Sequence, residues 1–323
     1  MLTVPNGASL TLKVDWQSVR LSYQERVRFQ RVLVTPLLAR QALGVDWVMV
    51  NGTDKEQSAE LYASVVSAMK GQEGQIIANK RIAKVCLAPG VNSGYFELPL
   101  ESPQLWTADH PQLYYLSLAY ADKQRLRTAH AERFGYREFK VQGNAFYLNG
   151  TRVYLFGENL SAVGYGGVGV DQETEKQRIA AKLVNFRRQG YTIVRNPHMP
   201  IVPAALEAAD EVGIMIYNEW AWAFTDWLDE AAFEENNLRE VQEWVWRDYN
   251  HPAVVMWSLG NEVKHANKPD VCRQMDKQAA LVRQLDRSGR PLCAFSGVAG
   301  LGSYGREKLQ TDFLDLHTYL GLS

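Results

Sequence analysis

The sequence changes its periodicity near residue 134, and this change constrains the fold more than any other feature. Before it, segments such as Ser9–Trp16 and Leu113–Tyr120 alternate apolar and polar residues with a period of two, which predicts half-buried β-strands. After it, apolar runs such as Tyr191–Val194 and Ile214–Tyr217 are separated by segments with helical spacing. Strands that alternate with helices predict a parallel sheet with right-handed crossovers.

The all-β part, residues 37–134, is expected to form one domain. Its predicted strands, which include Val45–Val50, are short and separated by turns, as in an immunoglobulin-like β-sandwich. The segment Lys55–Lys70 departs from this pattern, because its apolar residues recur at helical spacing. That spacing predicts a short inserted helix.

The α/β part, residues 135–323, begins with a hairpin signal. Asn149-Gly150 lies between two apolar segments, which predicts a two-residue hairpin turn. Gly190 and Gly213 each follow a helical stripe and are natural C-terminal caps. Six barrel-type strands are predicted: Arg152–Phe156, Tyr191–Val194, Ile214–Tyr217, Val254–Trp257, Leu292–Phe295 and Phe313–His317.

A (β/α)8 TIM barrel has eight strands, and the sixth predicted strand lies near Ser323. We therefore expect a multi-domain β plus α/β fold, in which an immunoglobulin-like β-sandwich precedes an incomplete (β/α)8 TIM barrel of about six strands. Such a barrel would leave unpaired sheet edges and exposed apolar faces. The isolated chain is therefore expected to aggregate or to form homo-oligomers.

Two polar residues, Asn261 and Glu262, follow the predicted buried strand Val254–Trp257. The carboxyl ends of parallel barrel strands are where catalytic residues lie. A carboxyl group there, with apolar neighbours, can stay protonated and act as a general acid. In the alternative interpretation Asn261 caps the next helix and Glu262 bonds its first-turn amide groups.

The stretch Asn250–Glu262 resembles the acid/base signature of glycoside hydrolase family 2, which includes β-galactosidases, β-glucuronidases and β-mannosidases. The segment Ser102–Tyr114 resembles the last strands of the immunoglobulin-like domain that precedes the barrel in this family. The resemblance implies a jelly-roll remnant at residues 1–36, the sandwich at residues 37–134 and the catalytic barrel at residues 135–323.

The resemblance also implies substrate-binding residues. The segment Arg195–Pro200 is similar to the family's Arg-x-x-His-x-Pro pattern, which carries over Arg195 and His198. Glu219 follows the third strand, where the family usually has Asp-Glu, and Tyr319 follows the sixth. The alternatives are a structural ion pair between Arg195 and Glu219, and an ordinary loop histidine at position 198.

Two departures from the family pattern stand beside these matches. Asn218 replaces the usual aspartate before the third-strand glutamate, and Gly157–Asn159 is not followed by the histidine of the family's Gly-x-Asn-x-His pattern. The missing histidine weakens any transfer of galactosidase-like metal or sugar contacts to this loop.

The implied reaction is retaining hydrolysis of terminal β-glycosides, which uses two carboxyl groups about 5 Å apart. Glu262 would be the acid and then the base, and Asn261 would bind the sugar 2-hydroxyl. The family's nucleophile is a glutamate after the seventh strand, which this sequence lacks, so the isolated chain is expected to be inactive. A non-catalytic carbohydrate-binding or scaffold protein is the alternative.

Gly164–Gly169 matches the dinucleotide fingerprint G-x-G-x-x-G, which would indicate a Rossmann-type oxidoreductase. Seven residues separate the predicted strand from the first glycine, whereas the fingerprint needs that glycine to close the strand. The acidic residue expected after the next strand is also absent, since Arg195 and Asn196 follow it. A glycine-rich loop above the barrel explains the motif better.

The resemblance implies a glycoside, an oligosaccharide or a polysaccharide as the partner, and composition excludes other classes. A net charge of −1 does not indicate electrostatic binding to nucleic acid or to an anionic membrane. No apolar run reaches the length of a membrane span. The three widely spaced cysteines suit neither a disulfide framework nor a zinc site, so no metal and no cofactor is expected. The N-terminus lacks a secretory signal pattern, and the compartment stays unassigned.

Overall fold

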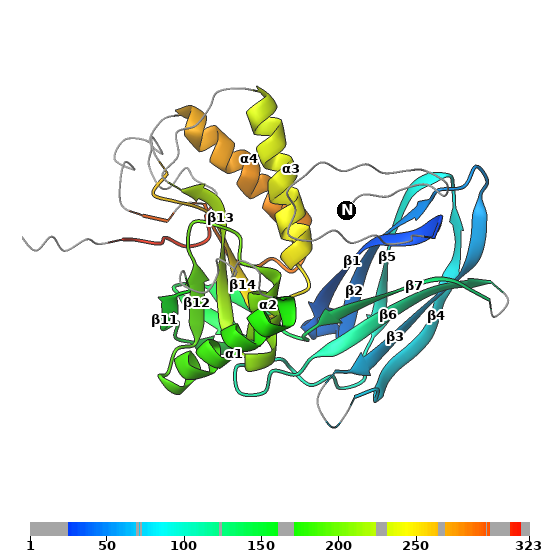
Figure 1. The fold of residues 1–323 in the computed structure, drawn as a ribbon, viewed down its shortest axis with the longest axis horizontal. Coiled ribbons are helices and arrows are strands. Elements are labelled where there is room, and N and C mark those ends of the chain that lie inside the picture. Colours follow the sequence, from blue (N-terminus) through cyan, green and yellow to red (C-terminus); the bar gives the residue numbers. More distant parts are fainter. Residues whose placement is uncertain are drawn as a thin grey trace, which may run out of the picture.

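The computed structural model describes residues 25–68, 71, 73–122, 125–160, 171–223, 231–263, 269–294, 296–297 and 311–317. The chain forms a β-sandwich and, beside it, an α/β unit whose helices flank a parallel sheet (Figure 1). In the part of the chain that is described, no helix is long and apolar enough to span a membrane.

The sandwich consists of two antiparallel sheets. The strand orders are β1-β2-β5 and β4-β3-β6-β7. Their bounds are β1 (Val27–Leu37), β2 (Ala42–Asn51), β3 (Gln57–Ser67), β4 (Ile76–Leu87), β5 (Gly90–Pro99), β6 (Tyr114–Asp122) and β7 (Arg125–Phe134), with a 3-10 turn, η1 (Leu38–Arg40), after β1. The alternating apolar residues of both sheets form one buried core between them, which confirms the expected immunoglobulin-like sandwich.

The helix predicted at Lys55–Lys70 is wrong, because this segment contains strand β3. Leu61 and Val65, which suggested the helix, are four residues apart, and that spacing also keeps two residues on one face of a strand. Ala59 and Ala63 are buried with them, so the burial has a period of two. The pattern was compatible with both structures, and pairing with β4 and β6 decides for the strand.

The sandwich also begins earlier than expected. β1 pairs with β2 from Val27 opposite Asn51 to Leu37 opposite Ala42. Residues 27–36 are therefore a strand of the sandwich, although the sequence placed them in a jelly-roll remnant. Residues 1–24 lie outside the described part of the chain.

A small antiparallel sheet, β10-β9-β8, connects the sandwich to the parallel sheet. Its strands are β8 (Phe139–Gln142), β9 (Ala145–Leu148) and β10 (Thr151–Val153). Asn149 and Gly150 connect β9 to β10 with φ values of 52° and 79°, so the predicted hairpin turn is confirmed. The barrel strand predicted at Arg152–Phe156 is wrong, because β10 pairs only within this hairpin sheet among the described strands.

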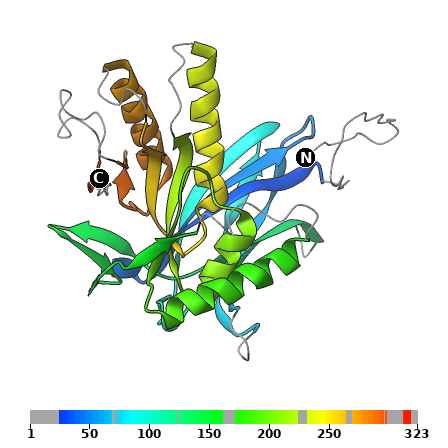
Figure 2. The same ribbon diagram turned by 60° about the vertical axis from the view of Figure 1, so that its left-hand side comes forward.

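The parallel sheet has the strand order β11-β12-β13-β14-β15. Its bounds are β11 (Gly157–Asn159), β12 (Ile193–Asn196), β13 (Met215–Ala223), β14 (Val254–Asn261) and β15 (Leu292–Cys293). Helices alternate with them: α1 (Gln172–Arg188), α2 (Pro203–Val212), α3 (Ala231–Asp248) and α4 (Pro269–Leu285) (Figure 2). Parallel bridges link Asn261 to Ser296 and Ser296 to Asp315, so a sixth segment continues the curved sheet as a partial barrel.

Buried polar contacts fix the sandwich against the amino end of β14. The carboxylate of Asp210 accepts hydrogen bonds from Arg133 of the sandwich at 3.1 Å and from the backbone N–H of Ala253 at 3.0 Å. Its second partner on the barrel side is the ring of His251, 2.6 Å away. Buried Arg137 donates to the backbone oxygen of Pro252 at 2.9 Å. These contacts hold the start of the strand that carries Asn261 and Glu262.

Candidate active site

The candidate residues of three neighbouring strands meet at the carboxyl edge of the parallel sheet. Arg195 of β12 pairs in register with Tyr217 of β13, and Asn261 is the last residue of β14. Glu219 lies two residues beyond Tyr217 on β13. Parallel strands end at one edge, so the register brings Arg195, Glu219 and Asn261 into direct contact.

Glu219 is fully buried, and its carboxylate accepts four hydrogen bonds. Arg195 donates two of them, from Nε at 3.0 Å and from a terminal nitrogen at 2.6 Å. The backbone N–H of His198 donates at 2.6 Å, and the Ser258 hydroxyl donates at 3.1 Å. Charge-assisted hydrogen bonds of this number fix the position of the carboxylate.

Arg195 links this carboxylate to Asn261. Its terminal nitrogen also donates to Oδ1 of Asn261 at 2.6 Å. Burial lowers the pKa of Arg195, but the adjacent Glu219 outweighs burial and the net pKa lies above its usual value. The guanidinium is therefore a fixed charge that orients the Asn261 amide, whose NH2 group is left to donate.

Glu262 has the left-handed backbone conformation, with φ of 46°. Its backbone N–H donates to the Ser296 carbonyl at 2.8 Å, which secures this conformation. A Cβ atom at Gly297 would lie 3.1 Å from Cγ of Glu262, so glycine leaves room for the carboxyl side chain. That side chain is 20% exposed. Such strain in a non-glycine residue is typical of functional sites.

The alternative of a helix cap is wrong. Asn261 belongs to β14, and the next described helix, α4, begins at Pro269. The Asn261–Glu262 pair thus ends a buried strand, as the sequence predicted.

The other predicted residues are only partly described. His198 is half-buried with φ of 71°, and its backbone N–H donates to Glu219. Tyr319 and the glycine motif Gly164–Gly169 lie outside the described residues. The substrate-binding roles of Arg195, His198, Glu219 and Tyr319 stay predictions.

Two family models match the chain. "Glycosyl hydrolases family 2" matches residues 27–137, and "Glycosyl hydrolases family 2, TIM barrel domain" matches residues 139–299. The chain belongs to glycosyl hydrolase family 2.

Curated relatives agree with this family. A Formosa agariphila protein named "Putative beta-glucuronidase" is 35% identical over 166 residues, which are 51% of this chain and 20% of that protein. A beta-galactosidase of Bacteroides ovatus is 27% identical over 230 residues, which are 68% of this chain and 26% of that protein. The matches thus span about a fifth to a quarter of these relatives.

Solved structures share the fold. A beta-glucuronidase of Bacteroides uniformis has a TM-score of 0.76 at 19% identity, and the match covers 91% of this chain and 37% of that one. A family 2 member from Bacteroides cellulosilyticus has a TM-score of 0.72 at 24% identity, covering 83% and 35%. At such identities the likeness supports the fold alone, namely a sandwich followed by a TIM-barrel domain.

Three residues of this family 2 chain complete the site although the sequence gave them no role. His317 lies 3.0 Å from Glu262, measured from Nδ1 to Oε1. Ser296 and Asp315 contact the other side of the same imidazole. The sequence did offer a signal for these residues. Ser296 directly follows the fifth predicted strand, and Asp315 and His317 lie in the sixth.

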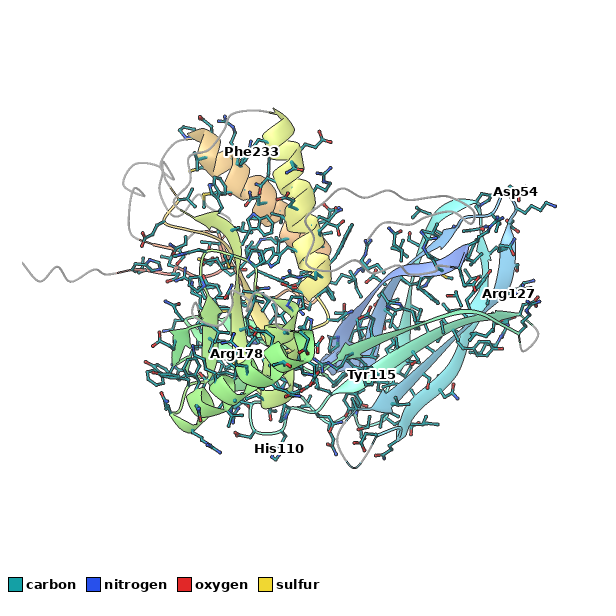
Figure 3. All side chains as sticks on the ribbon, in the orientation of Figure 1. Asp54, His110, Tyr115, Arg127, Arg178 and Phe233 are labelled. Carbon is teal, nitrogen blue, oxygen red and sulfur yellow. The ribbon has the colours of Figure 1, made fainter. Side chains whose placement is uncertain are left out.

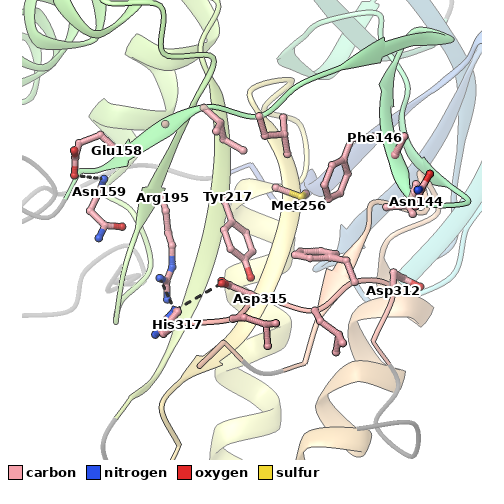
Figure 4. A pocket seen from close by; sticks show the side chains of 18 of the residues that line it. Asn144, Phe146, Glu158, Asn159, Arg195, Tyr217, Met256, Asp312, Asp315 and His317 are labelled. Atoms are coloured by element: carbon pink, nitrogen blue, oxygen red, sulfur yellow. Dashed lines mark hydrogen bonds and ion pairs between the residues drawn. The ribbon is translucent and has the colours of Figure 1, made fainter. Parts of the chain in front are cut away.

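A cavity of about 710 Å³ opens beside this network (Figure 4). It lies between the β8–β9 hairpin, strand β11 and residues 312–317. Arg195, Asp315 and His317 are polar residues of its wall, while Phe146 and Met256 are apolar ones. Its size and mixed lining suit a small polar ligand. No group of three or more potential metal ligands occurs among the described residues.

Proposed function

We propose that this chain is part of a retaining β-glycosidase in which Glu262 is the general acid/base. The observation that carries the proposal is the position of Glu262, at the carboxyl end of a buried parallel strand and next to an asparagine held by Arg195. This is the place and the pairing that acid/base catalysis at a barrel requires. Relatives named as beta-glucuronidases and beta-galactosidases support terminal β-glycosides as the substrate class.

In the first step Glu262 gives its proton to the glycosidic oxygen as the aglycone leaves, and a carboxylate nucleophile takes the sugar. In the second step Glu262, now a carboxylate, takes a proton from the water that releases the sugar. The Asn261 amide donates to the sugar 2-hydroxyl, a contact that strengthens in the transition state.

Glu219 is unsuited to be the nucleophile. Its carboxylate already accepts four hydrogen bonds and is fully buried. It acts instead as the anchor of Arg195, and the nucleophile is expected on a further barrel strand, as in the family resemblance. The specificity for the sugar and for the aglycone depends on loops outside this set of residues.

The test is Glu262→Gln in the longest natural polypeptide that contains this sequence, with a panel of aryl β-glycosides. Turnover of substrates with poor leaving groups should fall by about 10²- to 10⁴-fold. Substrates with highly activated leaving groups need little protonation and should show a smaller defect in the first step. Equal, small effects on all substrates would contradict the proposal. Saturable sugar binding without any turnover would favour the non-catalytic alternative.

A further inference from the structure

We propose that a groove between the sandwich and the amino end of the barrel binds a small tetrahedral oxyanion, such as inorganic phosphate or sulfate, and that the buried guanidinium of Arg137 anchors it. The groove has a volume of about 420 Å³, and we call it the junction groove. It is lined by residues 35–40 of the sandwich, by Arg137 and the start of β8, and by Arg287 and Ser288 after α4. Arg137 bonds Val254 at the amino end of β14, so this site is separate from the candidate active site at the carboxyl end.

Arg137 is a buried cation with one nitrogen to spare. Its exposed fraction is 4%. Nε donates to the Pro252 carbonyl at 2.9 Å, and one terminal nitrogen donates to the Val254 carbonyl. The other terminal nitrogen has no hydrogen-bond partner among the described residues, and it is not one of their unpaired polar atoms that are sealed from solvent. Because Arg137 lines the junction groove, this nitrogen is available to a ligand there.

No carboxylate pairs with this guanidinium in the described part of the chain. The two carboxylates whose charges act on Arg137 are those of Asp286 and Asp210. Asp286 already accepts hydrogen bonds from Trp257 at 2.7 Å and from Arg290 at 3.3 Å. Asp210 is bonded by the residues that join the sandwich to the barrel. A buried cation without a counter-ion is costly, and a bound anion would remove that cost.

The electrostatic surroundings of Arg137 agree with a missing counter-charge. Burial, and after it the charge of nearby Arg290, lower the pKa of Arg137 to about 9. A lowered pKa means that the protein disfavours the charged form of this side chain. The guanidinium is nevertheless cationic at neutral pH, and an anion beside it would favour the charged form.

Three further cations lie on the rim of the junction groove, and each has a carboxylate partner. These ion pairs are Lys140–Glu138 at 2.6 Å, Arg287–Asp46 at 3.0 Å and Arg40–Glu97. Their cationic side chains are exposed, and exposed ion pairs are weak, so these cations can also turn toward an anion. The rim charges are thus balanced by partners, and Arg137 is the cation of the groove that lacks one.

This arrangement of donors suits an anion with several oxygen atoms. One oxygen would accept from the terminal nitrogen of Arg137, and others would accept from Lys140 and Arg40, which belong to different elements of the chain. A tetrahedral oxyanion presents acceptors in several directions, whereas the two oxygens of a carboxylate lie in one plane. The bound anion would connect the sandwich to the barrel and stabilise the folded chain by mass action.

The test is isothermal titration calorimetry of the longest natural polypeptide that contains this sequence, at constant ionic strength. Inorganic phosphate and sulfate are titrated separately, and at least one of them should bind saturably. Arg40→Gln and Lys140→Gln should each weaken binding by about threefold to tenfold, because each removes a rim donor. The matched control is Arg127→Gln, which removes an exposed, ion-paired arginine at the end of the sandwich far from the barrel (Figure 3). It should leave the affinity unchanged.

The absence of saturable binding of either anion, or an affinity that is equal in the wild type and in both rim variants, would overturn the proposal. Arg137→Lys tests the anchor and should weaken binding by about tenfold. If this variant fails to fold, the rim variants still decide. In crystals grown with selenate, anomalous scattering should place selenium beside Arg137, and a peak elsewhere only would contradict the site. The site does not depend on the proposed function, since these measurements need no turnover.

Discussion

The two ends of β14 each carry a histidine–carboxylate pair, and the pairs differ in their surroundings. At the amino end, His251 contacts Asp210, whose side chain is 1% exposed and is bonded by Arg133 and the Ala253 N–H as well. At the carboxyl end, His317 contacts Glu262, whose side chain is 20% exposed and whose backbone has φ of 46°. The His251–Asp210 pair is surrounded by further hydrogen bonds within the protein, and the His317–Glu262 pair lies beside a cavity.

This difference indicates that the amino end of β14 contributes to stability, whereas its carboxyl end carries the proposed chemistry. In a barrel, the amino face of the sheet holds the structure together, and the carboxyl face carries the reacting groups. Asp210 joins the sandwich to the barrel, so its charge is committed to structure. The Glu262 side chain is 20% exposed and carries the proposed reacting group, and its backbone strain is borne by the rest of the fold.

The largest expected effect that tests this comparison is on stability at the amino end. Asp210→Asn leaves Arg133 and His251 without their buried counter-charge, so the free energy of unfolding should fall by about 3–5 kcal/mol. Glu262→Gln should change it by less than about 1 kcal/mol. Urea denaturation of both variants measures the two values. Similar losses of unfolding free energy in the two variants would contradict the proposed difference between the two ends of β14.

A second expected effect concerns strain beside Glu262. Gly297 has φ of 129°, and a Cβ there would press on Cγ of Glu262. Gly297→Ala should cost about 1–3 kcal/mol of stability and lower turnover by about 100-fold, because it displaces Glu262, the proposed acid. The matched control is Gly150→Ala in the hairpin turn, where φ is 79° and no atom crowds the added Cβ. The control should cost about 1 kcal/mol and leave turnover per folded molecule unchanged.

The smallest expected effect is on the pH dependence of stability. Burial lowers the pKa of His251, but Asp210 outweighs burial, and the net pKa lies above the usual value. A raised pKa in the folded state stabilises the fold fully below the unfolded value of about 6.5, and this stabilisation is lost as the pH rises through the folded value. Denaturation across this window should show the decline in the wild type and a weaker one in His251→Gln. A free energy that increases with pH through the window would reverse the assigned sign.

The sequence predicted the features that depend on local pattern. Asn149-Gly150 gave the hairpin turn, because both positions need positive φ and these residues tolerate it. The run Val254–Trp257 predicted a buried strand, and the observed strand ends at Asn261, directly before Glu262. These features arise from residues that are neighbours in the chain.

The features that the sequence missed depend on pairing between distant segments. Leu61 and Val65 fit a helix or a strand until β3 meets β4 and β6. The short run Arg152–Phe156 fits a hairpin strand or a barrel strand, and only the pairing of β10 with β9 decides for the hairpin. Glu262 contacts His317, which is 55 positions away in the sequence, and only the register of the strand ends brings them together.

The most direct measurement of the central claim is azide rescue of Glu262→Gln, made in the longest natural polypeptide with an activated aryl β-glycoside. Without its base, the variant should accumulate a glycosyl-enzyme, and azide, which needs no proton removal, should restore turnover and give the β-glycosyl azide. An α-glycosyl azide, or a variant as active as the wild type without azide, would contradict Glu262 as the acid/base of a retaining glycosidase.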